Sequence, residues 1–548
     1  MDDIIVLSIT ESLKKMGLKD IPYVEIEVPP HDHMGDLSTP IAMSLAKIFK
    51  KPPIKIAEEI IGLLPNKSVF SKIEVAGGGF INFSFSKDFL VESFKSILLK
   101  RDKVLFRNIG SGKKIQIEFI SANPTGPLHL GHGRGGATGN ALANILRVLG
   151  FEVEKEYYIN DAGRQVRLLG LSVFAKYKQI LGVDYPFPID GYRGYYVEDI
   201  AKKIIKDFGS RYIEKSFDEV SDFFIDYSYN TVMDWIREDL KDFGIMFDTW
   251  QSERELYRTH LVEETIQYLK NNNLVYEKDG ALWFESTRFG DDKDRVMIKS
   301  DGEYTYFTSD IAYHKNKLDR NFDVLINIWG ADHHGYISRI KAVIEALGYS
   351  KEKLHILLVQ MVTLLRKGRP VQMSKRSGEF ITLREVINEV GPDITKFIFL
   401  TRRPDSQLEF DLDVVKAQSS ENPVFYVQYA YARINSIFVF AEEKGIKIDN
   451  VNDDIDFNML NSDEELKMMK KILLFPMIMV KAARTYEPHR ITFYLQEISS
   501  IFHSYYNKFR VITDDVKLTK ARLALCDAIR FVLKEGLRLL GINAPERM

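Results

Sequence analysis

A strand–loop–helix segment at residues 117–150 constrains the fold of this chain more than any other feature. A strand ends near Ile120, a loop rich in proline and glycine follows, and an amphipathic helix comes next. His129 and His132 lie three residues apart at the start of this helix, which places both side chains on one face. Gly131, between them, has no Cβ atom, so a flat ring can approach the backbone. Because a helix N-terminus supplies free N–H groups and partial positive charge, the segment predicts a phosphate site.

A second segment, RPVQMSKRSGEFITL at residues 369–383, places Lys375 in a polar loop after a strand. A lysine in such a loop can reach a phosphate, with Ser374 and backbone N–H groups assisting. Taken alone, the segment is typical of a solvated basic loop. Together with the two histidines in one parallel-sheet domain, it favours a phosphate site.

The pattern of apolar residues predicts a multidomain α/β fold. Short strands alternate with helices from about residue 112 to 400, which indicates parallel βαβ units, and the mainly helical stretch from about 170 to 275 is typical of an insertion. In the N-terminal part, two neighbouring segments have helical spacing, and the first of these helices should stop at Lys51. Strands are expected there on either side of a Gly77–Gly79 turn. After about residue 415, long segments with helical spacing dominate. We therefore expect an N-terminal α/β domain, a Rossmann-type catalytic domain with helical insertions and an all-α helical bundle, with these boundaries: 1–108, 109–415 and 416–548.

Composition excludes several classes of protein. With 45% apolar and 28% charged residues, the 548-residue chain is neither wholly disordered nor collagen-like nor a coiled-coil rod. Its 75 Lys and Arg against 77 Asp and Glu exclude a globally basic binder, although a local basic face could still contact RNA. Cys526 is the single cysteine, which excludes an internal disulfide or a multi-cysteine zinc site, and we expect it to be buried in a helix. The acidic N-terminus and the lack of a long apolar run predict a cytoplasmic protein with no membrane span.

Long stretches of the chain resemble the arginyl-tRNA synthetase family, within the class I aminoacyl-tRNA synthetases. The resemblance runs from GDLSTPIAMSLAK and AGGGFINF near the N-terminus to RLLGINAPERM at the C-terminus. Its longest motifs lie between them: EFISANPTGPLHLGH (118–132), YYINDAGRQ (157–165), YTYFTSDIAYH (304–314), WGADHHGY (329–336), QMSKRSGEF (372–380) and NPVFYVQYAYAR (422–433). The resemblance implies an N-terminal tRNA-contacting domain, a Rossmann catalytic domain and a helical anticodon-binding domain.

The activity that the resemblance implies is the two-step ligation of L-arginine to its tRNA. Arginine attacks the α-phosphate of ATP and releases pyrophosphate, and the arginyl group then passes to the 3′-terminal adenosine of tRNA. The catalytic residues would be His129, His132 and Lys375, and loss of one such donor costs about 3 kcal/mol, or about 10²-fold in rate. The residues expected to bind ATP, which would arrive with Mg²⁺, are Gly131, His129, His132, Asp332, Met373, Ser374 and Lys375.

Arginine selection needs acceptors for a planar fork of N–H donors, and carboxylates provide them. By resemblance, Asp310 and Tyr306 would bind the guanidinium, Asn123 the α-amino and carboxylate end, and Glu118 would orient the site. Ser121 and His333 are also expected in the arginine pocket. Taken alone, Asp310 would be read as a helix N-cap.

The family has two short signature motifs, which in this chain are HLGH (129–132) and QMSK (372–375). The second signature departs from the family pattern at its first residue. The family usually has lysine where this chain has Gln372, whereas the later lysine, Lys375, is present. Family members that lose the later lysine carry a compensating lysine just before the first signature, and here that position is Gly126. We therefore assign the catalytic charge to Lys375 and none to Gln372.

The tRNA contacts are expected on aromatic side chains of the C-terminal helices and on the Gly77–Gly79 turn, because unpaired bases stack on aromatics. For any single tyrosine, burial in the core is the commoner role. The candidates are Phe80, Asn82, Tyr426, Tyr429, Tyr431 and Met548. The resemblance implies arginine tRNA, L-arginine and ATP as partners, a monomer, and no tightly bound metal.

Several alternatives stay open at this point. The two histidines could be a metal pair or a helix cap, and Asp332, His333 and His334 a metal cluster, although no further ligands at suitable spacing support metal. A cysteinyl-type class I synthetase would need a zinc site with several cysteines. A catalytically silent tRNA-binding paralogue should have eroded signatures, and a nucleotidyltransferase of the same superfamily should lack the helical tail.

Overall fold

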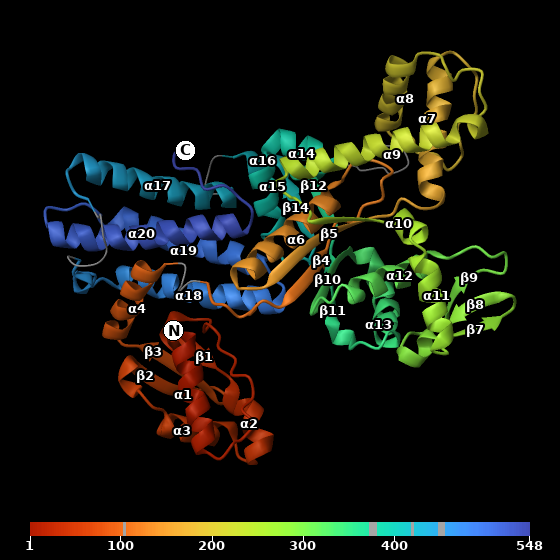
Figure 1. Cartoon of the computed structure of the whole chain (residues 1–548). Helices are drawn as coiled ribbons and strands as arrows, with labels where there is room; N and C mark the ends of the chain where they lie inside the picture. The colour runs from red at the N-terminus through yellow and green to blue at the C-terminus, as the bar shows by residue number, and fades with distance from the viewer. Residues whose placement is uncertain (102–105, 372–380, 418–420, 448–454) are drawn as a thin grey trace.

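We describe the chain from a computed structural model, which covers residues 1–101, 106–371, 381–417, 421–447 and 455–548 (Figure 1). It has an N-terminal α/β part, a central parallel sheet with helices, and a C-terminal group of long helices, which confirms the predicted fold class.

The N-terminal part is a three-stranded antiparallel sheet covered by helices. Its strands are β1 (Leu37–Thr39), β2 (Phe70–Ala76) and β3 (Phe80–Phe85), in the order β1-β3-β2. The hairpin turns at Gly79, as predicted, and a Cβ atom there would lie 2.7 Å from the Cβ of Pro53, so only glycine fits. The helices are α1 (Asp2–Lys15), α2 (Ile41–Phe49), α3 (Pro53–Leu63) and α4 (Lys87–Lys100), with short 3-10 turns at Asp32–Met34 and Lys67–Val69.

The helix α2 stops slightly earlier than predicted. The sequence places its end at Lys51, but the structure ends it at Phe49, with Lys50 in the left-handed conformation as C-cap. The helix α2 cannot continue into the two prolines that follow, because the residue before a proline avoids helical geometry.

The central sheet consists of five parallel strands in the order β11-β10-β4-β5-β6. Their bounds are Lys114–Glu118 (β4), Glu152–Ile159 (β5), Thr249–Ser252 (β6), Val324–Gly330 (β10) and Leu354–Val359 (β11). From β4 the chain adds β5 and β6 on one side, whereas β10 and β11 lie on the other side of β4. The order therefore reverses between β4 and β10, and in open α/β sheets ligands bind outside the strand ends at such a reversal.

The helices α6 (Leu130–Val148), α12 (Tyr306–Asp319) and α13 (Ile337–Ala346) connect these strands. Glycine lets α6 lie close to the sheet, because a Cβ at Gly139 would sit 2.4 Å from the ring of Phe119. This contact places the start of α6, with both histidines, at the strand end of β4.

The segment between β5 and β10 is only partly as predicted. Its helices are α7 (Arg164–Ile180), α8 (Tyr195–Phe208), α9 (Phe217–Asp242), α10 (Glu253–Arg258) and α11 (Leu261–Asn271), and α7 to α9 project away from the sheet in Figure 1. However, β6 within this stretch belongs to the main sheet. A small antiparallel sheet that the sequence did not predict follows: β7 (Val275–Lys278), β8 (Ala281–Phe284) and β9 (Arg295–Ile298), with a 3-10 turn at Ser286–Phe289.

The remaining elements of the central part follow β10 in the sequence and are mostly short. They are 3-10 turns at Ala331–Tyr336 and Lys351–Lys353, the strands β12 (Val362–Arg366), β13 (Arg369–Pro370) and β14 (Leu408–Asp411), and the helices α14 (Leu383–Val390), α15 (Pro392–Phe399) and α16 (Leu412–Lys416).

The C-terminal part consists of four long helices, as predicted. They are α17 (Pro423–Glu443), α18 (Asp463–Thr485), α19 (His489–Lys508) and α20 (Val516–Leu539), with a 3-10 turn at Phe457–Met459. Cys526 is fully buried in α20, as expected, and burial raises the pKa of its thiol to about 12. Among the described residues, no helix is long and apolar enough to cross a membrane.

The N-terminal part packs on the C-terminal helices (Figure 1). The ring of Phe94 in α4 lies edge-on to that of Phe457, with 5.6 Å between the centroids. Arg101 donates to Asp527 in α20 at 2.6 Å, and Lys470 in α18 pairs with Asp36 at 2.7 Å. The two ends of the chain therefore form one packed unit.

Candidate active site

A cavity of about 610 Å³ lies at the reversal point of the central sheet. Its walls come from the strand ends of β4 and β10, the start of α6 and the first turns of α12. Every site residue of the catalytic domain that the sequence predicted and the structure describes lines it: Glu118, Ser121, Asn123, His129, Gly131, His132, Tyr306, Asp310, Asp332 and His333. Met373, Ser374 and Lys375 lie outside the described residues.

The two histidines cap the helix α6. Nδ1 of His129 accepts the backbone N–H groups of Gly131 at 3.1 Å and His132 at 3.4 Å. Nδ1 of His132 in turn accepts the N–H of His129 at 3.3 Å, and the two rings stack with 3.6 Å between their centroids. The helix-cap alternative and the phosphate alternative are therefore compatible, since the cap uses only Nδ1.

This capping fixes the tautomer of both rings. A nitrogen that accepts a hydrogen bond carries no proton, so a neutral His129 or His132 holds its proton on Nε2. Each imidazole Nε2–H group can therefore act as a donor toward an anion in the cavity, and the helix N-terminus adds partial positive charge. The cap itself uses the backbone N–H groups of His129, Gly131 and His132.

The residues after the second signature lie beside the first signature. Thr382 forms a β-bridge with His129, and the N–H of Leu383 donates to the carbonyl oxygen of Leu128 at 2.8 Å. Arg134 in α6 is fully buried and donates to the carbonyl oxygens of Gln360, Arg403 and Ser406. These contacts tie α6 to the chain on both sides of residues 372–380.

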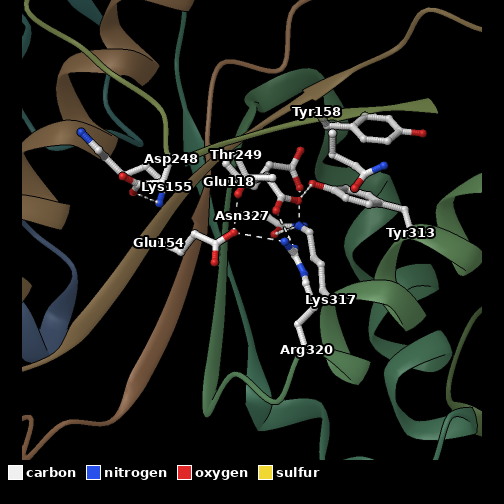
Figure 2. Close-up of polar contacts among 12 residues, drawn as sticks. Glu118, Glu154, Lys155, Tyr158, Asp248, Thr249, Tyr313, Lys317, Arg320 and Asn327 are labelled. Atoms are coloured by element: carbon white, nitrogen blue, oxygen red, sulfur yellow. Dashed lines mark hydrogen bonds and ion pairs between the residues drawn. The ribbon is translucent and has the colours of Figure 1, made fainter. Parts of the chain in front are cut away.

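The cavity has a buried acidic floor. Glu118 at the end of β4 accepts the hydroxyl of Ser121 at 2.9 Å and pairs with Lys317, as Figure 2 shows for the ion pair. Asp310 in α12 accepts the hydroxyl of Tyr336. Burial raises the pKa of Asp310 to about 6, the hydrogen bond from Tyr336 opposes this shift, and the charge of Glu118 adds to it.

The other predicted residues form the rim. Asn123 and Tyr306 are exposed, and so are Asp332 and His333, whose side chains approach each other to 3.8 Å. Within the described ranges, no group of three or more His, Cys, Asp or Glu side chains could hold a metal ion. The cavity thus combines an acidic floor with a helix N-terminus that carries partial positive charge and two imidazoles.

Sequence reasoning missed Glu253, the first residue of α10. It lines the cavity and is 3% exposed, and its Oε2 has no hydrogen-bond partner among the described residues. Burial, together with the charges of Asp310 and Asp161, raises its pKa to about 7. Asp161 holds the turn before it by accepting the hydroxyl of Ser252 at 2.7 Å and the N–H of Arg254 at 3.0 Å.

Tyr158 is a second missed residue of the floor. Its hydroxyl is buried without a partner among the described residues, and its ring stacks on Tyr313 with 4.2 Å between the centroids. Buried polar atoms without partners at a cavity wall are available to polar atoms of a ligand. Tyr158 lies in the YYINDAGRQ motif (157–165), but the motif does not show which of its side chains reaches the cavity. Glu253 belongs to none of the motifs, and only the fold brings it there.

Two of the residues predicted to contact RNA are not on the surface. Asn82 is 5% exposed and accepts the hydroxyl of Ser38 at 2.7 Å, so the expectation of an exposed turn is wrong for it. Tyr431 is 4% exposed and belongs to the core of the C-terminal helices. Phe80 and Tyr426 are half-buried.

A second cavity, of about 1,340 Å³, lies between α17, α19 and the C-terminal residues. Tyr429 and Met548 line it, whereas Tyr426 and Tyr431 do not. Arg433 lies over the rings of Tyr429 and Tyr506, at 4.5 and 4.9 Å from their centroids. Aromatic and cationic side chains of this kind suit unpaired bases.

Three family models match the chain along its length. The arginyl tRNA synthetase N terminal domain matches residues 3–85, the catalytic domain of class I (R) tRNA synthetases matches 93–401, and the DALR anticodon binding domain matches 427–548. The catalytic model alone covers more than half of the chain. The chain belongs to the arginyl-tRNA synthetase family.

Curated relatives agree with this family. The arginine–tRNA ligase of Syntrophotalea carbinolica is 50% identical over 96% of this chain and 95% of its own length. That of Bacillus licheniformis is 46% identical over 100% of this chain and 99% of its own. The arginyl-tRNA synthetase of Thermus thermophilus has the same fold, with a TM-score of 0.80, 24% identity and 99% of each chain covered.

Proposed function

We propose that arginine and ATP meet in the cavity at the reversal point of the central sheet, and that the residues lining it carry the chemistry of the family. The chain ligates L-arginine to tRNA in two steps. The observation that carries the placement is the pairing, within one cavity, of the capped α6 N-terminus with the half-buried carboxyl of Asp310.

The ATP side of the cavity is the start of α6. His129 and His132 donate from Nε2 to phosphate oxygens, and Gly131 lies between them. A Cβ atom at Gly131 would lie 3.0 Å from Cε1 of His129, so glycine makes room for the capping ring. Asp332 on the rim assists, and Met373, Ser374 and Lys375 of the second signature complete the site from outside the described residues. Mg²⁺ accompanies ATP as part of the substrate and neutralises phosphate charge.

The arginine side is the acidic floor. Asp310 and Tyr306 bind the guanidinium, because a carboxylate gives charge-assisted bonds to its N–H groups. Asn123 and Ser121 hold the α-amino and carboxylate end, His333 closes the rim, and Glu118 orients the floor. A site built from buried acceptors rejects citrulline and lysine, since either would leave partners unpaired.

The chemistry needs no covalent protein nucleophile. A carboxylate oxygen of arginine forms a bond to the α-phosphorus as the bond to pyrophosphate breaks, and the ribose hydroxyl of tRNA then displaces AMP from the arginyl carbonyl. The protein positions both substrates and stabilises the charge that develops on the phosphate oxygens. Lys375 holds the departing pyrophosphate.

The remaining parts of the chain hold tRNA. We place the domains at 1–108, 109–415 and 416–548, and the three matched family models lie close to these divisions. The second cavity, with Tyr429 and Met548, receives anticodon bases, and Phe80 and Tyr426 are secondary candidates. We further propose that the chain works as a cytoplasmic monomer.

Arginine binding should weaken at low pH. Asp310 and Glu253 have raised pKa values of about 6 and 7, so each gains a proton as the pH falls through those values. A guanidinium binds the ionised carboxylates, and kcat/KM for arginine should therefore fall by about tenfold per pH unit between the two pKa values and by about a hundredfold per unit below the lower one. Steady-state pyrophosphate exchange between about pH 5.5 and 8.5 measures this profile.

The Glu253→Gln variant separates the two groups in that experiment. It should lose the part of the profile near pH 7 and keep the part near pH 6, because Asp310 still titrates. A wild-type profile that stays flat from pH 8 to 6 would contradict the assignment of these carboxyls to the arginine site.

The direct test of the proposed site is arginine-dependent ATP–pyrophosphate exchange, with and without arginine tRNA. We expect exchange with arginine alone among the amino acids, and a drop of about 10²-fold in the Lys375→Ala variant. A thermal melt of the variant checks that folding survives. Undiminished exchange in the variant would remove Lys375 from the mechanism, and exchange with another amino acid would remove the arginine assignment.

A further inference from the structure

Lys317 is a buried cation behind the floor of the cavity. Its side chain is 0% exposed, it does not line the cavity, and its ammonium pairs with Oε2 of Glu118, which does. It also donates to Oδ1 of Asn327 at 2.9 Å and lies 4.4 Å from the ring centroid of Tyr313 (Figure 2). A cation held this far from water contributes to the charge balance of the floor, because screening is weak there.

The same lysine fixes the hydrogen bonds that hold Asp310. Asn327 accepts the Lys317 proton through Oδ1, so its Nδ2 donates to Nε2 of His314 at 3.1 Å. Nδ1 of His314 then carries the proton and donates to the backbone carbonyl oxygen of Asp310 at 2.8 Å. Burial, with the nearby charge of Lys317, lowers the pKa of His314 to about 3, so this ring stays neutral. Lys317 thus acts on Glu118 directly and on the Asp310 turn through two residues.

The two carboxylates of the floor differ as a result. In Glu118, one oxygen pairs with Lys317 and the other accepts the Ser121 hydroxyl, so its charge is balanced inside the protein. Asp310 forms no ion pair within the described part of the chain and accepts only the hydroxyl of Tyr336. A guanidinium that enters the cavity therefore meets one balanced carboxylate, Glu118, and two that form no ion pair within the described part of the chain, Asp310 and Glu253.

We propose that Lys317 is a specificity-determining positioning residue: it neutralises Glu118 and thereby leaves Asp310, together with Glu253, to bind the substrate guanidinium. This inference rests on the proposed placement of arginine in the cavity. It assigns Glu118 a structural charge whose partner is Lys317, and not a direct contact with arginine.

A double-mutant cycle tests the proposal in the full-length chain. Glu118→Gln leaves an unbalanced ammonium beside the guanidinium site, and Lys317→Met leaves an unbalanced buried carboxylate. We expect each change to raise KM for arginine by about tenfold or more, with KM for ATP changed by less than about threefold. The double variant replaces the ion pair by a neutral pair of similar shape, and should recover to within about threefold of the original KM for arginine.

A matched control is Lys155→Met. Lys155 is another buried lysine of the same sheet, but its ammonium donates to Asn140 at 3.2 Å, away from the cavity. This change should lower the melting temperature and leave KM for arginine unchanged. The control separates the effect of losing any buried lysine from the effect of losing Lys317.

Each outcome either supports or overturns the proposal. A double variant as impaired as Glu118→Gln overturns the proposal, because Glu118 would then bind arginine itself, and this comparison holds even if Lys317→Met alone fails to fold. A normal KM for arginine in a folded Lys317→Met variant overturns it as well. Asp310→Asn distinguishes the proposed site from this inference: if that change leaves KM for arginine unaltered, the placement of arginine fails first.

Discussion

Replacing Asp310 with asparagine should lower kcat/KM for arginine by about 10³-fold, equivalent to about 4 kcal/mol. The change keeps the shape of the side chain and an acceptor for the Tyr336 hydroxyl, but removes the charge that a guanidinium needs. Because Asp310 is only partly exposed at the cavity wall, water can replace little of the lost interaction. Pyrophosphate exchange at varied arginine concentration measures the effect, and KM for ATP should stay within about threefold.

Asp319→Asn is the matched control on the same helix. Asp319 pairs with Lys315 at the surface, at 2.6 Å, and such a pair contributes little to stability. The Asp319→Asn change should leave kcat/KM for arginine and KM for ATP unchanged. If Asp310→Asn retained kcat/KM for arginine within threefold, the acidic floor would not be the guanidinium site.

The second large decrease in activity is expected for a substitution of His132. His132→Asn should keep the helix cap, because the amide oxygen can take the place of Nδ1 as acceptor for the N–H of His129. It removes the Nε2–H donor, and kcat for pyrophosphate exchange should fall by about 10²- to 10³-fold. KM for arginine should change little, because the arginine floor lies on β4 and α12.

Ser86→Ala separates capping from catalysis. The Ser86 hydroxyl caps α4 by accepting the N–H of Phe89, far from the cavity, so its loss should cost about 1 kcal/mol of stability and no rate. A His132→Asn variant with a normal kcat would mean that the cap is the whole role of this histidine.

The helix N-terminus with its two histidines was predictable because its chemistry is local. His129, Gly131 and His132 adjoin in the sequence, and a strand–loop–helix pattern places them at a strand end without knowledge of distant contacts. The long C-terminal helices were predictable for the same reason, since an apolar period of 3.6 persists over twenty residues or more. Pro476 lies inside α18 without ending it, so this period outweighed even a helix breaker.

The acidic floor could be predicted only in part. Asp310 and Glu118 sit in recognisable motifs, but the partner of Glu118 is Lys317, which is 199 residues away and has no motif of its own. Glu253 reaches the cavity because β6 joins the main sheet, whereas the sequence indicated a mainly helical insertion there. The strands β7 to β9 escaped prediction because four-residue strands carry too few alternations to stand out.

Asn82 shows why a polar residue near a turn is ambiguous. On β3 it faces Ser38 of β1 across the sheet, and the hydrogen bond between them satisfies a buried amide. The sequence alone does not show whether such a polar residue is buried with a hydrogen-bond partner or exposed to water. For Asn82 the partner, Ser38, lies 44 residues earlier.

The contact between the two ends of the chain bears on how the protein is made. Arg101 and Asp527 are 426 residues apart, and α4, whose buried side chains include Phe94, packs on α18 and α20 near the end of the sequence. At a synthesis rate of about 5 to 20 residues per second, α4 leaves the ribosome about 20 to 85 s before its partner. During that interval its apolar face is open to chaperones or to other nascent chains, so the N-terminal part completes its packing only after translation has almost finished.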